Sequence, residues 1–380
     1  MAMPLFMLKR GIVNILILDN SFRGAYGSFG LFLREIGTAL EAMGHRVAVS
    51  RSAPESAHVL ERESVDFSLG IGRFGQFLDG EPLYDVLGVH HYQWIVDCPY
   101  KMALDDRSAF VKYVFIDAGF SQVAPKLKRA PLTLPLGVPV ASLSKDPISS
   151  SRGEIVFAGQ IRDTSRIVAE IQANKRRAEI MAAIDYCVGN MDLPFLQNYR
   201  SATAGMPEKI QANMFGPVNS FVRAYKREYV ISHITGRQIS VIGEVSSPAV
   251  LSRRNVRLLG KLPYADAFAR IRGYRYALNV EPNFNEGWHD RVLRAPSCGT
   301  LPVTNRRVDT GEDRCLQDDM VTYDYCSVDE IDDRLDALSV VDVDARLDRL
   351  KDMIGRRYGW PTVLSRIIHD RKESADGGKQ

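Results

Sequence analysis

A stretch near the C-terminal end, residues 276–304, constrains the fold of this chain more than any other. Its sequence is YALNVEPNFNEGWHDRVLRAPSCGTLPVT. The pattern predicts a short strand ending at Asn279, a polar loop, a helix from about Asp290 and a second strand over 301–304. The loop would lie at the carboxyl edge of a parallel sheet, where such sheets bind ligands. Because a helix start offers unpaired N–H groups, the stretch predicts a phosphorylated, nucleotide-linked ligand.

Length and composition fit a soluble chain with two domains. The chain has 380 residues, of which 45% are hydrophobic and 25% are charged. Its net charge of +3 argues against a dedicated nucleic-acid binder, so we expect no nucleic-acid partner. Five cysteines without a CxxC spacing disfavour both a disulfide framework and a zinc site and suit the cytoplasm. No apolar run approaches the roughly 20 residues of a membrane span.

Charge is unevenly distributed along the chain. The stretch from Arg223 to Arg275 is basic, and the stretch from Asp309 to Asp348 is acidic. Solvated helix faces are the simpler interpretation of both stretches. The alternative for the basic stretch is a surface for phosphates or anionic lipids, which would give peripheral contact with the inner face of a membrane.

Hydrophobic periodicity predicts two α/β halves. The first half opens with a strand over 13–18, a glycine loop over 19–30, a helix over 31–43 and a strand over 46–49. Further strands are expected at 67–71, 88–90 and 113–116, and a Ser- and Pro-rich linker follows. In the second half we expect a strand at 155–158, a long helix over 165–184, helical insertions over 188–214, strands at 239–243 and 256–259, a helix over 264–272 and mostly helix over 328–371.

The C-terminal motif resembles a known family. Residues 286–303, EGWHDRVLRAPSCGTLPV, resemble the E-G-F-G-x-x-x-x-E-A-x-A-x-G-x-P-V segment of group-1 glycosyltransferases. Residues 276–279 and 291–299 resemble still more the L-N and R-x-x-E-A-x-A-x-G pattern of the spore-maturation-type glycosyltransferase-like branch. The resemblance implies the GT-B fold, in which two Rossmann-like domains face each other across a cleft. It also implies sugar transfer from a nucleotide-diphosphate-sugar donor to an acceptor hydroxyl.

The GT-B layout gives the expected domain boundaries. We expect an N-terminal acceptor-side domain over 1–140, a linker over 141–153 and a C-terminal nucleotide-sugar-binding domain over 154–350. A last helix over 351–371 would cross back to the N-terminal domain, and residues 372–380 would be disordered.

The resemblance also implies a set of donor-binding residues. Arg291, Arg162 and backbone N–H groups near Ser297–Thr300 suit a diphosphate. Gly299 would permit close backbone approach, and Trp288 suits stacking on a base or sugar. The complete expected set is Gly159, Arg162, Gly243, Gly260, Lys261, Pro263, Asn279, Glu286, Gly287, Trp288, His289, Arg291, Arg294, Ser297, Gly299 and Thr300.

One of these positions departs from the family pattern. The first Glu of the family pair, which contacts the donor, corresponds to Glu286. The second Glu, which grips the ribose diol, corresponds to Arg294. Arginine cannot accept hydrogen bonds from a diol, so either the ribose is held differently, or Arg294 contacts a phosphate, or donor binding is weakened.

Candidate acid–base groups lie in the N-terminal half. His90 and His91 are expected at the carboxyl end of the strand over 88–90, and Asp97 follows in a loop. A histidine paired with a carboxylate is a suitable base near neutral pH. The alternative is a packed histidine and an Asp97 that caps a helix. If the transfer retains configuration, the pair would only position the acceptor.

The remaining motifs argue against an NAD-dependent dehydrogenase and against a metal-dependent enzyme. Gly24, Gly27 and Gly30 suit a loop that approaches the acceptor or a phosphate, but their G-x-x-G-x-x-G spacing is a poor match to an NAD fingerprint. No DxD motif stands in a context that would hold a divalent metal ion, so we expect no metal and no cofactor beyond the donor. A sugar-nucleotide epimerase, and a non-catalytic binding protein on a decayed glycosyltransferase scaffold, remain the alternatives to a glycosyltransferase.

Overall fold

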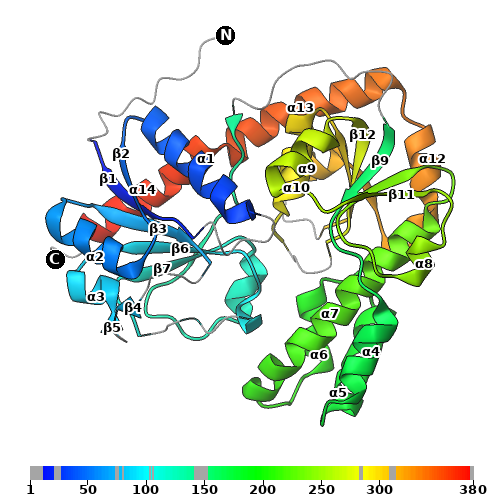
Figure 1. Cartoon of the computed structure of the whole chain (residues 1–380), viewed down its shortest axis with the longest axis horizontal. Coiled ribbons are helices and arrows are strands. Elements are labelled where there is room, and N and C mark those ends of the chain that lie inside the picture. Colours follow the sequence, from blue (N-terminus) through cyan, green and yellow to red (C-terminus); the bar gives the residue numbers. More distant parts are fainter. Residues whose placement is uncertain are drawn as a thin grey trace.

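A computed structural model describes residues 12–20, 27–72, 77–78, 81–101, 104, 107–140, 153–281, 286–307 and 314–376. The chain forms two α/β domains that face each other, each built on a six-stranded parallel sheet (Figure 1). The predicted pair of Rossmann-like domains is confirmed. The predicted linker lies, except for Gly153, outside the described residues.

The N-terminal sheet has the strand order β2-β1-β3-β6-β7-β8. Its strands are β1 (Asn14–Leu18), β2 (Arg46–Ser50), β3 (Phe67–Ile71), β6 (His91–Ile95), β7 (Val111–Phe115) and β8 (Leu132–Thr133). The helices are α1 (Ser28–Ala42), α2 (Ala53–Arg62) and α3 (Leu83–Leu87), and β4 (Phe77–Leu78) pairs with β5 (Glu81–Pro82). Strands β1 and β3 are almost entirely buried, as parallel strands covered on both faces must be.

The C-terminal sheet has the strand order β11-β10-β9-β12-β13-β14. Its strands are β9 (Gly153–Ala158), β10 (Ile239–Ile242), β11 (Val256–Gly260), β12 (Tyr274–Asn279), β13 (Leu301–Asn305) and β14 (Val321–Tyr323). The connecting helices are α8 (Pro248–Leu251), α9 (Tyr264–Ile271), α10 (Asp290–Arg294), α11 (Arg314–Asp319) and α12 (Ile331–Asp336). The strand–loop–helix–strand unit predicted for residues 276–304 is present: β12 ends at Asn279 and α10 begins at Asp290.

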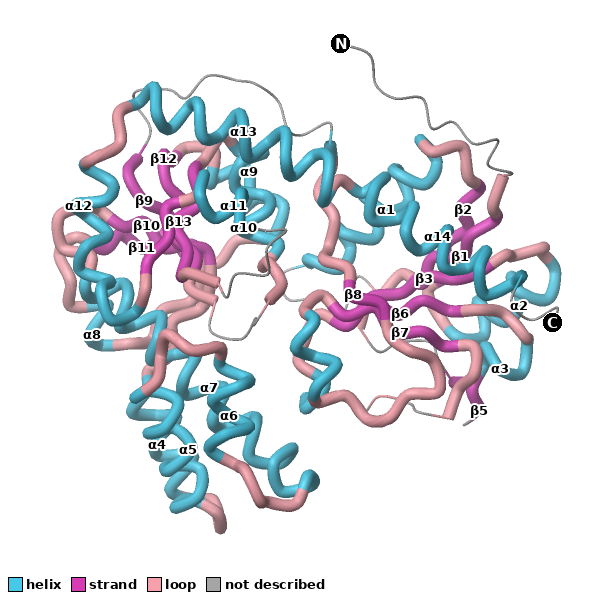
Figure 2. Tube along the Cα trace, turned by 180° about the vertical axis from the view of Figure 1, so that it is seen from behind, coloured by secondary structure: helices cyan, strands magenta, loops and turns pink. Residues whose placement is uncertain are grey.

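A helical arm separates β9 from β10. It consists of α4 (Thr164–Gln172), α5 (Arg177–Gly189), α6 (Phe195–Ala202) and α7 (Glu208–His233), and it projects away from the C-terminal sheet in both views (Figures 1 and 2). The single long helix predicted over 165–184 is wrong, because Asn174 accepts the backbone N–H of Arg176 at 2.9 Å and breaks the helix. The arm touches the N-terminal domain through Tyr100, whose ring packs on Phe215 and whose hydroxyl donates to Gln211.

The last two helices join the domains. Helix α13 (Val340–Tyr358) packs into the C-terminal core, whereas α14 (Trp360–Asp376) packs into the N-terminal core. The crossing back predicted for the end of the chain is therefore present, but it begins at Trp360 rather than at residue 351. The predicted disorder after residue 371 is also wrong as far as Asp376, because α14 continues to that residue.

The strand predicted at 88–90 is misplaced. Gly88 has φ +66° and follows the end of α3, so the chain turns there and β6 begins only at His91. This shift of three residues places His90 and His91 at the amino edge of the sheet, opposite the edge that was expected.

Candidate functional site

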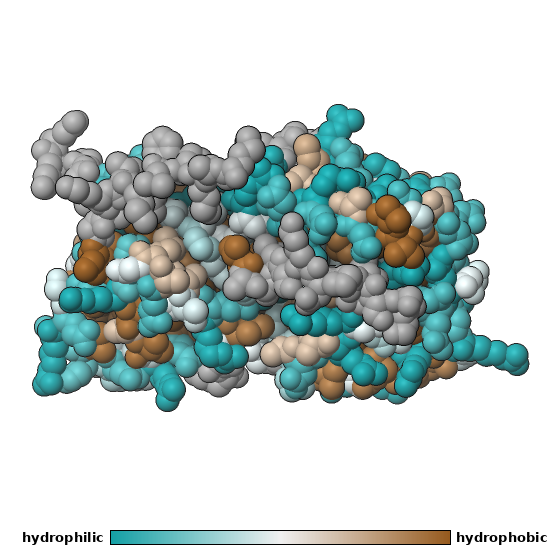
Figure 3. All heavy atoms as spheres, turned by 90° about the horizontal axis from the view of Figure 1, so that it is seen from above, coloured by the Kyte–Doolittle hydropathy of each residue, from teal (hydrophilic) through white to brown (hydrophobic). Residues whose placement is uncertain are grey.

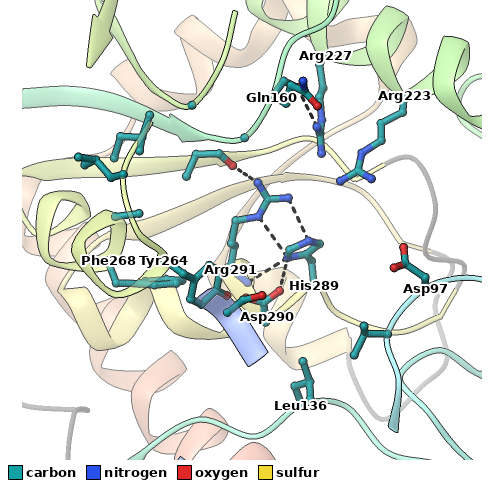
Figure 4. A pocket seen from close by; sticks show the side chains of 18 of the residues that line it. Asp97, Leu136, Gln160, Arg223, Arg227, Tyr264, Phe268, His289, Asp290 and Arg291 are labelled. Atoms are coloured by element: carbon teal, nitrogen blue, oxygen red, sulfur yellow. Dashed lines mark hydrogen bonds and ion pairs between the residues drawn. The ribbon is translucent and has the colours of Figure 1, made fainter. Parts of the chain in front are cut away.

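A cavity of about 590 Å³ lies between the two domains, at the carboxyl edges of both sheets. Its walls come from the start of α1, from the loops after β6, β7, β9 and β10, and from α7, α9 and α10. Figure 4 shows that charged side chains gather on one side of it and aromatic side chains on another.

Four arginines belong to the described lining of the cavity, and all four come from the C-terminal domain. Arg223 and Arg227 are four residues apart and therefore share one face of α7. Arg227 donates to Gln160 O at 2.9 Å, and Arg291 of α10 donates to Ala158 O (Figure 4). Arg162 follows β9. Among the described residues, Nε of Arg223 and both Nε and Nη2 of Arg227 are buried without a hydrogen-bond acceptor. Such donors favour an anionic ligand, because leaving them unpaired is costly.

Acidic residues balance part of this charge. Burial alone raises the pKa of Glu281, but the guanidiniums of Arg223, Arg227 and other arginines outweigh it, so that the pKa is lowered and Glu281 is ionised. Burial, then the nearby arginines, hold the pKa of His289 well below its ordinary value, so its imidazole is neutral. Burial raises the pKa of Asp290. Counted formally, the described lining contains four arginines and two aspartates, Asp97 and Asp290, which gives a net charge of +2. That charge matches a diphosphate diester.

Two glycines let the segments that follow β9 and β10 approach each other closely. Gly243 has φ +145°, and a Cβ atom there would overlap the carbonyl oxygen of Gly159. A Cβ atom on Gly159 would lie 3.0 Å from Nη1 of Arg291. Both positions therefore require glycine to keep this edge compact and to leave room for Arg291.

Aromatic side chains form another end of the cavity. Phe29 and Phe32 come from α1 of the N-terminal domain, and Tyr264 and Phe268 come from α9 of the C-terminal domain. The ring centroids of Phe32 and Tyr264 are 5.4 Å apart, and those of Tyr264 and Phe268 are 5.0 Å apart. This aromatic end spans both domains and suits a flat apolar group such as a nucleobase.

Seven of the predicted site residues belong to the described lining of the cavity. They are Asp97, Gly159, Arg162, Gly243, Trp288, His289 and Arg291. Asp97 enters from the loop after β6, at the carboxyl edge of the N-terminal sheet. In Figure 4 it lies to the right of His289 and below Arg223. Trp288 is buried, with the Arg307 guanidinium 5.8 Å from its ring centroid.

The expected position of His90 and His91 in the cleft is wrong. His91 is fully buried: it stacks on Tyr84 at 4.1 Å, accepts from or donates to Ser68 at 2.8 Å and lies 2.6 Å from Oε1 of Gln93. Because an amide oxygen only accepts, Nε2 of His91 carries the proton. His90 contacts Arg129 at 2.5 Å, also at the amino edge. Burial lowers the pKa of each histidine to about 4. Neither side chain reaches the cavity.

Arg294 also lies outside the cavity. Its guanidinium forms a bidentate ion pair with Glu35 of α1, at 2.8 and 2.5 Å, and donates to Gly137 O at 3.1 Å. The expected contact of Arg294 with the donor is therefore wrong. The arginine that stands in place of the family's Glu forms an ion pair between the two domains instead.

Glu286 and Gly287 act through their backbone. Both N–H groups donate to Oδ2 of the buried Asp117, at 2.9 and 2.7 Å. A Cβ atom on Gly287 would overlap the carbonyl oxygen of Ile116. The loop before α10 is thus held against the N-terminal domain, and the Glu286 side chain is not part of the described lining.

The other predicted residues support the fold around the cavity. The buried Thr300 donates to Ile271 O at 3.2 Å, and Asn279 donates to Thr304 at 3.1 Å. Ser297 donates to Arg294 O, and Gly299 ends a 3-10 turn with φ +66°. Gly260 has φ +78°, Lys261 forms an ion pair with Glu244, and Pro263 precedes α9. In the N-terminal domain, Gly27 precedes α1 and Gly30 is buried within that helix. Gly24 lies outside the described residues.

Sequence reasoning missed Arg223 and Arg227. Both belong to the basic stretch whose simpler interpretation was a solvated helix face. Their spacing of four residues was a usable signal, because it places both guanidiniums on one face of a helix that Val222 and Val230 help to bury.

One protein-family model matches a segment of the C-terminal domain. Residues 220–351 match the family model described as glycosyl transferase-like. No curated protein matches the chain. The prediction of a group-1 glycosyltransferase-like family is confirmed for this segment.

Several solved structures share the fold. A glycosyltransferase involved in avilamycin A biosynthesis is 12% identical, with 96% of this chain and 98% of that chain covered and a TM-score of 0.55. An alpha-glucosyltransferase in complex with UDP-glucose and DNA is 9% identical, with coverage of 95% and 99% and a TM-score of 0.57. Sucrose-phosphate synthase from Thermosynechococcus elongatus is 10% identical, with coverage of 96% and 100% and a TM-score of 0.53. At these identities the likeness shows the GT-B fold.

Proposed function

We propose that this GT-B chain, whose residues 220–351 match the glycosyl transferase-like family, transfers a sugar from a nucleotide-diphosphate-sugar donor to an acceptor hydroxyl. The observation that carries the proposal is the set of buried, unpaired N–H groups of Arg223 and Arg227 in a cavity with a net charge of +2. The solved alpha-glucosyltransferase that shares the fold is in complex with UDP-glucose, which agrees with a donor of this kind.

The donor would lie along the cavity. Its diphosphate would contact Arg223, Arg227 and Arg291, and its base would occupy the aromatic end near Tyr264 and Phe268. Guanidinium–phosphate hydrogen bonds are charge-assisted and therefore strong. The reaction moves negative charge onto the leaving nucleoside diphosphate, so the same arginines would stabilise the transition state more than the bound donor.

We propose Asp97 as the general base that removes the proton from the acceptor hydroxyl. Asp97 is the carboxylate that the N-terminal domain contributes to the described lining, at the sheet edge where ligands bind. A base at this position corresponds to an inverting transfer, in which the acceptor oxygen attacks the anomeric carbon directly.

Calorimetric titration with a panel of nucleoside diphosphates tests the donor site. We expect one nucleotide to bind wild-type protein and Arg227→Met to weaken it about 10- to 100-fold, because one charge-assisted hydrogen bond contributes about 1.5 to 3 kcal/mol. The matched control is Arg254→Met, an exposed cation of the same domain that is absent from the described lining of the cavity. Its effect should stay below threefold. Binding of no nucleotide, or an equal loss in both variants, would contradict the proposal.

The two alternatives are less well supported. Arg294 motivated the decayed-scaffold alternative, and it lies outside the cavity, so its charge does not oppose donor binding. An epimerase also binds a nucleotide-sugar. It would convert the donor without an added acceptor, and product analysis distinguishes the two reactions.

Contact with a membrane surface stays a prediction. No helix in the described part of the chain is long and apolar enough to cross a membrane. Within the basic stretch, Lys226 and Arg227 are buried, whereas Arg254, Arg257 and Arg270 are exposed. On the face shown in Figure 3, apolar residues lie scattered among polar ones. Metal independence and the cytoplasmic location likewise stay predictions.

A further inference from the structure

One ion pair, Arg294–Glu35, connects four segments of the chain that belong to both domains. Glu35 of α1 accepts two hydrogen bonds from Arg294 of α10 and a third from Nε1 of Trp360 of α14, at 2.8 Å. Arg294 donates in addition to Gly137 O, in the last segment described before the linker. Only 5% of the Arg294 side chain and 14% of the Glu35 side chain is exposed, so the pair is shielded from water and salt.

The chain packs closely around this ion pair. A Cβ atom on Gly137 would overlap the Trp360 ring, so the indole lies directly on the backbone there. Val138 N–H donates to Tyr358 O at 2.9 Å, and Trp360 N–H donates to Val138 O at 3.0 Å. The two chain crossings between the domains therefore lie side by side, next to the Arg294–Glu35 pair.

The same pair orders the aromatic end of the cavity. The Arg294 guanidinium lies 4.9 Å from the ring centroid of Phe32 and 5.8 Å from that of Phe268. Phe32 belongs to the N-terminal domain and Phe268 to the C-terminal domain, and both line the cavity. Arg294 thus lies between the two walls that would enclose a nucleobase. The four arginines of the opposite end, by contrast, all come from the C-terminal domain.

We propose that Arg294 is a positioning residue whose ion pair with Glu35 holds the two domains closed and so builds the aromatic end of the cavity before any ligand binds. The interpretation of the cavity as a nucleotide site rests on the proposed function, whereas the closed arrangement does not. Breaking the pair should therefore weaken recognition of a nucleoside far more than recognition of a diphosphate.

The double variant Glu35→Gln/Arg294→Met tests this inference, because it removes both charges and leaves neither unpaired in the interface. Two probes are titrated by calorimetry: the nucleoside diphosphate that wild-type protein binds, and inorganic pyrophosphate. We expect the Kd of the nucleotide to rise at least tenfold and that of pyrophosphate to change less than threefold. Small-angle X-ray scattering without ligand should show a larger radius of gyration than for wild type.

The controls separate positioning from general damage. Asp352→Asn/Arg356→Met removes an exposed ion pair within α13 and should change neither Kd nor the radius of gyration. The single variant Arg294→Lys keeps the positive charge beside Glu35, and it should bind the nucleotide more tightly than the double variant does. An unchanged radius of gyration together with an unchanged nucleotide Kd in the double variant would overturn the inference, as would an equal loss of both probes. If wild-type protein binds neither probe, the proposed function fails, and the scattering result still decides whether the pair holds the domains together.

Discussion

The two sheet edges that face the cavity differ in what they contribute. The C-terminal edge is basic: Arg162 and Arg291 surround the glycine contact between Gly159 and Gly243. The N-terminal edge presents mainly apolar side chains, and its ionisable group in the described lining is Asp97. One edge is therefore suited to hold an anion, and the other to exclude water and accept a proton. A fold with two similar domains thus becomes asymmetric through the few residues that follow its strands.

The largest expected effect tests whether Asp97, rather than a histidine at the amino edge, is the general base. Asp97→Asn should lower kcat about 10²- to 10⁴-fold, because a general base contributes that much, while nucleotide affinity stays near wild type. His90→Gln, at the opposite edge of the same sheet, should leave kcat within about threefold. Steady-state kinetics with the donor that the nucleotide panel identifies measures both. If the His90 variant lost activity and the Asp97 variant stayed active, Asp97 would not be the general base.

A second substitution tests the compactness of the C-terminal edge. Gly243→Ala should destabilise the protein by about 3 kcal/mol, because alanine is strained at φ +145° and its methyl group would overlap the Gly159 carbonyl. Gly189→Ala is the matched control at the last residue of α5: apart from its chain neighbours and the backbone of its own helix, no atom lies within 4 Å of its Cβ position, so stability should change by less than about 1 kcal/mol. Urea unfolding measures both. Equal stability of the two variants would show that the glycine contact is dispensable.

The smallest expected effect concerns the amino edge and pH. The folded state holds the pKa of His91 at about 4, below the ordinary 6.5, because burial disfavours the imidazolium. The unfolded chain therefore binds more protons between these values, and stability falls as the pH drops from about 6.5 towards 4. At pH 4.5 the loss from His91 is about 2 to 3 kcal/mol relative to pH 7.5. Urea unfolding at both pH values should show a smaller difference for His91→Gln. An equal difference would exclude His91 as the source.

The fold and the C-terminal half of the site were accessible from the sequence, because the strand that ends at Asn279 is bounded by a clear polar loop. The N-terminal half was misjudged because Gly88 ends a helix rather than beginning a strand, and a shift of three residues moves a side chain from one edge of a parallel sheet to the other. Arg294 could not have been placed, because its partner Glu35 is 259 positions away. Arg223 and Arg227 were within reach through their helical spacing.

The position of α14 has a consequence for how this protein is made. Trp360, Val363, Leu364, Ile367 and Ile368 belong to the same buried cluster as β1, β3 and β6. The N-terminal domain therefore lacks part of its core until residues 360–368 have been added. During translation, apolar surface of the N-terminal domain stays exposed until the C-terminal domain, which has its own core, has been synthesised. Order of synthesis and order of completion are thus reversed, and a chain cut short before Trp360 would lose the domain that was made first.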